Sequence, residues 1–220
     1  MEIRFGLEPV VVAIILLAAF PETGFSSEPP GYAIYFELGV MGGGDRLARG
    51  ADNSGYAGRG TSDIDAGAGL QYALGVRIDP GWEGLDGDLL LSLGYLDSKI
   101  DEDNGSASFD VTRISLVYVL PGKESFFSYG AGLDLHLNPS YRFDESPLAS
   151  CSLSDCLTSE LPAGTTDFDP ALGILLQAEI TAYFRGLKLG LRYSAIEYRG
   201  GGESFDAGGL GYYFSYTHWL

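Results

Sequence analysis

Apolar and polar residues alternate along eight stretches of the chain. In the last stretch Tyr212, Phe214 and Tyr216 fall on one face, and Ser215 and Thr217 fall on the other. A period of two residues is that of a β-strand, whose successive side chains point to opposite sides. The same alternation predicts strands over residues 32–41, 67–78, 88–96, 109–120, 126–137, 171–184, 187–196 and 209–220.

The connections between the predicted strands alternate in length. Four are long, over residues 42–66, 97–108, 138–169 and 197–208, and three are short, over residues 79–86, 121–124 and 185–186. An even number of strands with alternating long loops and short turns is typical of membrane-spanning barrels, whose strands have roughly 9–11 residues. The sequence therefore predicts an all-β protein, an eight-stranded antiparallel up-and-down transmembrane β-barrel. A soluble barrel of the lipocalin type, with its apolar face inward, is the alternative.

The less apolar face of each predicted strand is mostly Gly, Ser and Ala, with one or two charged residues. Such a face suits the narrow interior of an eight-stranded barrel, which side chains fill. It carries four acids and four bases, although the whole chain has 30 acids and 13 bases. Because buried charges must be paired, we expect a lumen ion-pair network formed by Glu37, Arg77, Asp88, Arg113, Asp134, Glu179, Lys188 and Arg192.

The short connection Arg185-Gly186 allows one of these pairs to be predicted. A two-residue hairpin turn there would place Phe184 opposite Leu187 and fix every other cross-strand pair of the hairpin. Glu179 would then lie opposite Arg192. We therefore expect a Glu179–Arg192 ion pair at the centre of the network, extended by Arg113 or Glu37.

The N-terminal segment has the features of a secretory signal peptide. Arg4 precedes a short apolar run, Pro9–Phe20, and Gly24 and Ser26 offer small residues before a cleavage point. The run is shorter than the roughly 20 residues that a membrane-spanning helix needs. We expect residues 1–26 to be a cleaved signal peptide and residues 27–220 to form the barrel domain. A buried helix of a cytosolic protein is the alternative for this segment.

The net charge argues against one class of partner, and the two cysteines predict a disulfide. Cleavage would remove three acids and one base, which changes the formal net charge from −17 to −15. Such acidity argues against nucleic acid as a partner. In an exported chain Cys151 and Cys156 are expected to form a disulfide that clips a small loop. No cofactor and no metal are expected.

Two segments carry a resemblance to a known family. The segments ALGILLQAEITAYFRGLKLGLRYSAIEY and FDAGGLGYYFSYTHWL resemble the penultimate hairpin and the closing strand of the small outer-membrane β-barrels, the opacity-protein-like and OmpW/OmpX-like superfamily. The resemblance covers about residues 31–220. It implies a monomer in the bacterial outer membrane, surrounded by lipid and lipopolysaccharide. It also implies that the barrel-assembly machinery reads the terminal strand through Tyr212, Phe214, Tyr216, Trp219 and Leu220, although the family usually ends on Phe or Trp.

Few residues of the chain suggest a catalytic role. His136 follows Asp134 by two residues and precedes Ser140, so a His–Ser–acid set for a lipid-modifying enzyme is conceivable. The alternative is a histidine within the interior hydrogen-bond network. His218 is expected on the lipid face, near the membrane interface.

Two loop sequences suggest ligands. The acidic run from Asp97 to Gly105 could bind a divalent cation weakly, or could be a solvated loop. The run Gly42–Gly44 lacks the lysine and the helix of a phosphate-binding loop. We therefore expect a non-enzymatic barrel whose extracellular loops serve envelope structure, adhesion or surface interaction. A narrow channel for small or hydrophobic solutes is the alternative, and a lipid A-modifying enzyme is a third possibility.

Overall fold

The structure is a computed structural model that describes residues 31–49, 63–79, 87–102, 105–121, 126–145, 158–159, 161–181, 186–200 and 202–220. The predicted signal peptide lies outside the described residues, and so do Cys151 and Cys156. Within the described part of the chain no helix is long and apolar enough to span a membrane.

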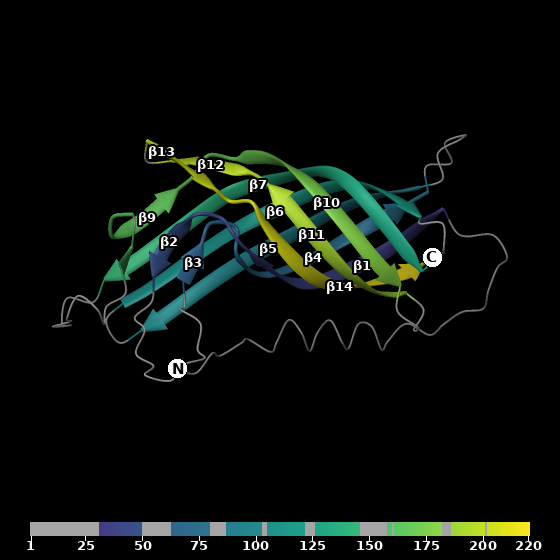
Figure 1. Cartoon of the computed structure of the whole chain (residues 1–220), viewed down its shortest axis with the longest axis horizontal. Helices are drawn as coiled ribbons and strands as arrows, with labels where there is room; N and C mark the ends of the chain where they lie inside the picture. Colours follow the sequence, from purple (N-terminus) through teal and green to yellow (C-terminus); the bar gives the residue numbers. More distant parts are fainter. Residues whose placement is uncertain are drawn as a thin grey trace. The chain divides into compact units, whose positions relative to one another are not determined.

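Eight antiparallel strands close into a barrel (Figure 1). Each strand pairs with its sequence neighbour in the barrel, and β14 pairs with β1 to complete the circle. The predicted up-and-down barrel is therefore confirmed, and each predicted strand is present. The barrel strands are β1 (Tyr32–Gly42), β4 (Gly69–Ile78), β5 (Asp88–Glu102), β6 (Gly105–Pro121), β7 (Phe127–Glu145), β10 (Ala171–Thr181), β11 (Leu187–Ala195) and β14 (Gly209–Trp219).

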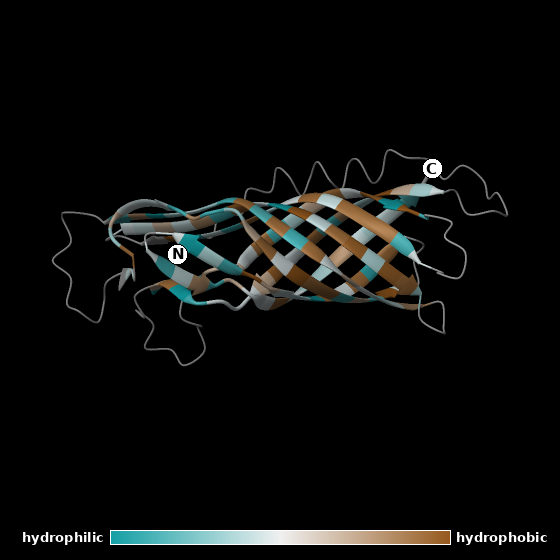
Figure 2. Cartoon of the chain, turned by 90° about the horizontal axis from the view of Figure 1, so that it is seen from above, coloured by the Kyte–Doolittle hydropathy of each residue, from teal (hydrophilic) through white to brown (hydrophobic). Residues whose placement is uncertain are grey.

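The two faces of the wall follow the predicted alternation. Outward side chains are apolar and open to the surroundings, and Leu74, Leu93, Leu172 and Ile174 are each at least 60% exposed. Inward side chains are buried, including every residue of the predicted lumen network except the half-buried Asp88. Figure 2 shows hydrophobic residues along the barrel wall. The lipocalin-like alternative, with its apolar face inward, is therefore excluded.

Aromatic residues border this apolar wall at both ends. Tyr72 and Tyr95 pair across β4 and β5, with ring centroids 5.6 Å apart, at the end where the long connections leave. Phe127 and Tyr129 lie at the opposite end of the wall, with centroids 6.3 Å apart. An apolar band between aromatic girdles is the pattern of a membrane-spanning barrel.

Beyond the first girdle, strands continue where loops were expected. The predicted loop over residues 97–108 is instead a hairpin that lengthens β5 and β6, with Glu102 opposite Gly105. We call the described strands and turns beyond the barrel wall the extension. It holds the upper parts of β5, β6 and β7 together with β2 (Arg46–Arg49), β3 (Asp63–Asp65), β8 (Thr158–Ser159), β9 (Gly164–Asp167), β12 (Glu197–Gly200) and β13 (Glu203–Asp206).

The extension has an apolar core of its own. Its fully buried side chains include Leu47 on β2, Ile64 on β3, Phe109 on β6, Tyr141 on β7 and Tyr198 on β12. The hydroxyl of Tyr141 on β7 donates to the Leu47 carbonyl of β2 at 3.3 Å, which joins the two sides of this core. The barrel interior holds the charged and polar residues beside a small apolar cluster of Tyr35, Leu90, Val117, Val119 and Leu175. The interior of the extension is mainly apolar.

A β-bulge in β7 allows this difference. Asn138 has a φ of 49°, and Asn138 and Pro139 together face the single residue Val111 of β6. One extra residue reverses which side chains point inward. His136 is therefore buried below the bulge, and Tyr141 is buried above it.

The glycine run Gly42–Gly44 is a close backbone crossing and not a phosphate cradle. Gly44 has a φ of 95°, and a Cβ on it would lie 1.8 Å from the Ala66 carbonyl oxygen. A Cβ on Gly67, whose φ is 88°, would lie 2.1 Å from the Ala207 carbonyl oxygen. The glycines let three connections meet where the extension joins the barrel.

The apolar wall makes a testable prediction. Leu91 and Leu176 are 44% and 48% exposed on the outer face. Leu91→Arg or Leu176→Arg is expected to lower the free energy of unfolding in bilayers by about 2–4 kcal/mol, measured by urea titration in lipid vesicles. Ser204→Arg, at an exposed position on β13, is the control and should change little. Equal stability of all three variants would contradict the assigned lipid face.

Candidate functional site: the charged barrel interior

The structure joins the eight charged residues of the predicted lumen network into four ion pairs. Arg77 Nε lies 2.5 Å from Asp88 Oδ2, and Lys188 Nζ lies 2.9 Å from Glu179 Oε2. The other two pairs are Arg113–Asp134 and Arg192–Glu37. Four acids and four bases thus neutralise one another inside the barrel, as buried charges require.

Arg192 and Glu37 form the pair with the most complete geometry. Both guanidinium Nη atoms donate to the Glu37 carboxylate, one of them at 2.7 Å. Arg192 Nη2 also donates to Gln177 Oε1 at 3.2 Å, and the guanidinium lies 4.5 Å from the centroid of the Tyr213 ring. Two-point binding of a carboxylate is the arrangement that the planar guanidinium favours. The pair joins β11 to β1 across the closing strand β14.

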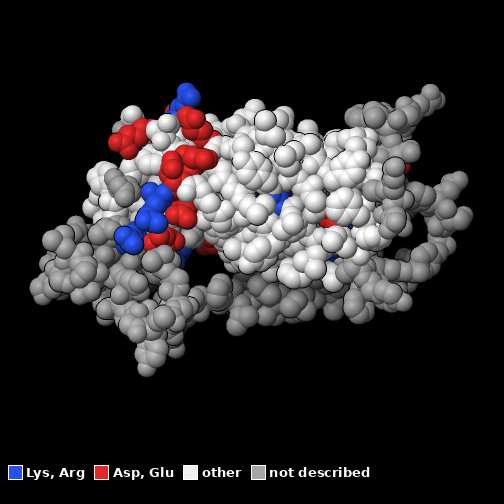
Figure 3. Space-filling view, viewed as in Figure 1, with Lys and Arg blue, Asp and Glu red and all other residues white. Residues whose placement is uncertain are grey.

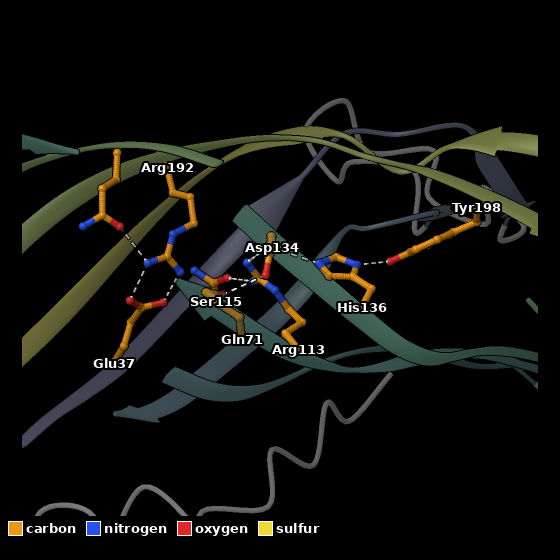
Figure 4. Close-up of polar contacts among 9 residues, drawn as sticks. Glu37, Gln71, Arg113, Ser115, Asp134, His136, Arg192 and Tyr198 are labelled. Atoms are coloured by element: carbon orange, nitrogen blue, oxygen red, sulfur yellow. Dashed lines mark hydrogen bonds and ion pairs between the residues drawn. The ribbon is translucent and has the colours of Figure 1, made fainter. Parts of the chain in front are cut away.

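Arg113 begins a second chain of contacts that leads into the extension. Arg113 donates to Asp134 and to Gln71 Oε1, and His136 Nε2 lies 3.1 Å from Asp134 Oδ2. The other ring nitrogen of His136 lies 2.5 Å from the hydroxyl oxygen of Tyr198. Figure 4 shows Asp134, His136 and Tyr198 following one another away from the Arg192–Glu37 pair.

Glu179 anchors the charged cluster nearest the short turns. Besides Lys188, it accepts hydrogen bonds from Tyr213 Oη at 3.0 Å and from Ser128 Oγ at 3.3 Å. The Tyr213 ring lies directly over Gly190, where a Cβ would meet a ring carbon at 2.2 Å. A glycine at this position therefore makes room for the tyrosine that holds Glu179.

The predicted Glu179–Arg192 pair is wrong. In the β10–β11 ladder Arg192 lies opposite Gln177, and Glu179 lies opposite Gly190. The register differs from the prediction by two residues, which keeps both side chains inside the barrel but changes their partners. The connecting residues 182–185 lie outside the described part of the chain. The prediction failed because it assumed the shortest turn.

Several interior polar residues that contact the charged pairs were not predicted as part of the site, among them Gln71, Gln177, Tyr198 and Tyr213. Gln71, Gln177 and Tyr213 all stand on the predicted inner face, so alternation identified their direction but not their role as partners of the charged residues. Tyr198 lies in a segment that was expected to be a loop. For Gln71, Gln177 and Tyr213, an uncharged polar residue at an inward position is the sequence signal that could have identified a partner of the charged residues.

The structure does not assemble the His–Ser–acid set considered from the sequence. His136 is buried against Asp134, but the bulge places Ser140 on the outer face. There its hydroxyl donates to Asp167 Oδ1 at 3.0 Å. His136 therefore takes the alternative role, a member of the interior hydrogen-bond network. His218 is half-buried and lies beside Ile34 at the short-turn end of the barrel.

The structure also shows where the acidic run and the residues of the terminal strand lie. Asp97 to Glu102 belong to β5, and among the described residues no group of three or more His, Cys, Asp or Glu is arranged to hold a metal. In β14, Tyr212 and Phe214 are exposed on the outer face and Tyr216 is half-buried. The backbone of Trp219 pairs with Ala33, and Leu220 is 52% exposed.

Comparisons with known proteins give similarities of fold. No protein-family model matches the chain, and no curated protein matches its sequence. Among solved structures, Ail of Yersinia pestis, crystallised with the heparin analogue sucrose octasulfate, is 12% identical with a TM-score of 0.45, over 86% of this chain and 100% of that one. Neisserial surface protein A is 13% identical with a TM-score of 0.45, over 86% and 99% of the two chains. OprG from Pseudomonas aeruginosa is 13% identical with a TM-score of 0.44, over 88% and 98%. The eight barrel strands close in sequence order, as the resemblance to the small outer-membrane barrels implies, so the predicted fold is confirmed.

Proposed function

We propose that the protein is an integral outer-membrane barrel that acts as a closed anchor and presents its extension at the cell surface. The apolar wall between two aromatic girdles lies in the bilayer, and the short turns face the periplasm. Residues 1–26 direct export and are removed, and residues 27–220 form the monomeric barrel domain. The assembly machinery folds it through its terminal strand, and lipid with lipopolysaccharide surrounds it.

The proposal rests on one observation: side chains fill the interior both in the barrel and in the extension above it. In the barrel, three of the four ion pairs join neighbouring strands, and the Arg192–Glu37 pair joins the strands on either side of β14. Glu37, Arg113, Asp134 and Arg192 are each no more than 5% exposed. In the extension, the apolar core fills the interior above them. A water-filled pore would leave charged side chains solvated, so the packing favours an anchor over a channel.

The charge distribution supports a working surface at the extension. Figure 3 shows charged side chains gathered at the end of the molecule where β9, β12 and β13 lie, and almost only uncharged atoms over the barrel wall. Several of these charged residues are exposed acids, such as Asp167, Asp169, Glu197 and Glu203. A strongly charged, exposed end on an apolar anchor favours contact with polar surface molecules, which include lipopolysaccharide and the surfaces of other cells.

A conductance measurement tests the closed anchor. The purified barrel in planar bilayers is expected to give no single-channel steps, because the lumen is filled at two levels. Arg113→Ala with His136→Ala, which thins the polar layer only, should still give none while the apolar core remains. Steady single-channel currents from the wild-type barrel would contradict the proposal and favour the narrow channel.

Lipid A mass tests the non-enzymatic part of the proposal. Cells that express the wild-type chain and cells that express His136→Ala are expected to have identical lipid A mass spectra, because His136 is buried in the interior network. A mass change that depends on His136 would instead support the lipid-modifying enzyme.

A further inference from the structure

A row of basic and hydroxyl side chains crosses the outer face of the extension. Lys99 lies opposite Ser108, Ser108 lies opposite Arg142, and Arg142 lies opposite Thr165, so the row crosses β5, β6, β7 and β9. We call these four residues the outer basic row. Lys99, Arg142 and Thr165 are exposed and Ser108 is half-buried.

The bulge in β7 is what completes this row. Below it, the outward residues of β7 are odd-numbered, such as Leu133 and Leu135; above it, they are even-numbered. Without the extra residue, Tyr141 would face outward and Arg142 would face the apolar core. The bulge therefore turns an arginine out beside Ser108 at the same position where it turns an aromatic residue in.

The row lies just above the apolar wall. On β5 the outward positions run from Tyr95 of the girdle through Asp97 to Lys99. Lys99 is four residues beyond Tyr95, which is about 13 Å along the strand. At the usual tilt of the strands in a membrane barrel, this length corresponds to about 10 Å along the membrane normal. The headgroup layer outside the hydrocarbon core is about 5–8 Å thick. Lys99 therefore lies at or slightly above the headgroups of the outer leaflet.

The side chains of the row suit a phosphate group. Neighbouring strands are about 4.8 Å apart, so the Cα atoms of Lys99 and Arg142 lie about 10 Å apart, with the Ser108 hydroxyl between them. Arg142 Nε lies 3.5 Å from Thr165 Oγ1, so the guanidinium leans toward the Thr165 end of the row, and its other nitrogen atoms are left to donate to a phosphate. A guanidinium, an ammonium and intervening hydroxyl donors together provide the hydrogen bonds and the charge that a phosphate needs.

The acids around the row limit what can bind there. The next outward row toward the membrane contains Asp97, Asp110 and Asp167, and Asp144 lies on the opposite side. These carboxylates oppose the approach of a bare anion that diffuses in from bulk water. A phosphate that its lipid already holds beside the row, and that divalent cations bridge to these carboxylates, meets less of this repulsion.

We propose that the outer basic row binds a phosphate group of a phosphorylated glycolipid of the outer leaflet, the lipid A class. The inference rests on the proposed membrane location, and it makes the extension a lipid-binding collar as well as a surface for contact with other molecules. The row would fix the height and the rotation of the barrel against the lipid around it.

Binding of defined lipids tests this proposal. The folded barrel in neutral detergent is titrated with diphosphorylated lipid A, with its dephosphorylated counterpart and with inorganic phosphate, and bound lipid is counted by native mass spectrometry. The phosphorylated lipid is expected to bind at least about tenfold more tightly than the dephosphorylated one, since 1.4 kcal/mol is a factor of ten. Equal binding of the two lipids would overturn the proposal. If inorganic phosphate competes for the row as well as the lipid does, the proposal that the bound phosphate belongs to a lipid would be overturned.

Matched variants assign the binding to the row. Lys99→Gln with Arg142→Gln should lower affinity for the phosphorylated lipid at least about tenfold, and Lys99→Arg should keep it, because a cation remains. Arg199→Gln is the control, an exposed arginine on β12 that pairs with Glu197 at 3.1 Å, and should change affinity less than about twofold. Unchanged binding by the double variant would overturn the site.

Insertion is measured separately, so that the two proposals can fail independently. Wild type and the double variant should both insert into neutral phosphatidylcholine vesicles and become protected from protease along the barrel wall. Failure of the wild type to insert would count against the membrane location. Normal insertion without preference for phosphorylated lipid would count against the outer basic row alone.

Discussion

Replacing Arg192 by methionine is expected to lower the free energy of unfolding by about 3–5 kcal/mol, because it leaves the Glu37 carboxylate buried without its partner. The side chains of Arg192 and Glu37 are only 5% and 3% exposed, so water cannot compensate for the loss. Arg192→Met also removes the guanidinium from the Tyr213 ring and from Gln177. Urea unfolding of the barrel in lipid vesicles, followed by its heat-modifiable mobility in gels, measures the change.

A double-mutant cycle separates the pair from its surroundings. Arg192→Met together with Glu37→Gln should cost about 1–3 kcal/mol less than the sum of the two single changes, because each single variant leaves a lone buried charge and the double variant leaves none. Arg199→Met is the matched control: its ion pair with Glu197 has side chains that are 75% and 54% exposed and should contribute about 0–1 kcal/mol. Additive losses in the cycle would show that Arg192 and Glu37 do not act as a pair.

The barrel could be predicted from the sequence because a strand in a membrane has two chemically opposite environments. The lipid admits only apolar side chains on one face, while the narrow interior takes Gly, Ser and paired charges on the other. Leu91 and Ser92 show the contrast within one step, since the first is 44% exposed and the second is 6% exposed. The period of two residues therefore predicts both the positions of the strands and the directions of their side chains.

The partners of the charged residues could not be predicted in the same way. Alternation gives the face of a residue but not its register, and a shift of two residues keeps every face unchanged. Glu179 and Arg192 both point inward as expected, yet each meets a different partner. Arg192 in fact reaches Glu37, 155 residues away in the chain. Such a contact depends on closure of the barrel and not on one hairpin.

The extension was missed for a different reason. Its added strands are short, and water on one side allows polar residues there, so the apolar contrast that reveals a lipid-facing strand is absent. The bulge at Asn138 also reverses the alternation in the middle of β7, so no single period describes the strand. Tyr141 and Tyr198 therefore stood in predicted loops, although both are fully buried.

The junction between barrel and extension depends on glycine for two separable reasons. Gly67 has a φ of 88°, which strains any residue with a Cβ, and its Cα lies so close to β13–β14 that a Cβ would be 2.1 Å from the Ala207 carbonyl oxygen. Gly202 has the same φ of 88°, but no atom lies within 4 Å of the position of its Cβ. The two glycines thus share the backbone strain and differ in the close approach.

Gly67→Ala is therefore expected to destabilise the extension by about 4 kcal/mol or more, because backbone strain and a collision with backbone add together. Gly202→Ala should cost only the strain, about 1–2 kcal/mol. Urea titration with limited proteolysis of the barrel in vesicles measures both: Gly67→Ala should expose cleavage sites in the extension at low urea, while the membrane-embedded wall stays protected. The collision involves backbone, which no side-chain rotation relieves. If the two alanine variants prove equally stable, then the close packing of the junction contributes nothing and the extension is held by its apolar core alone.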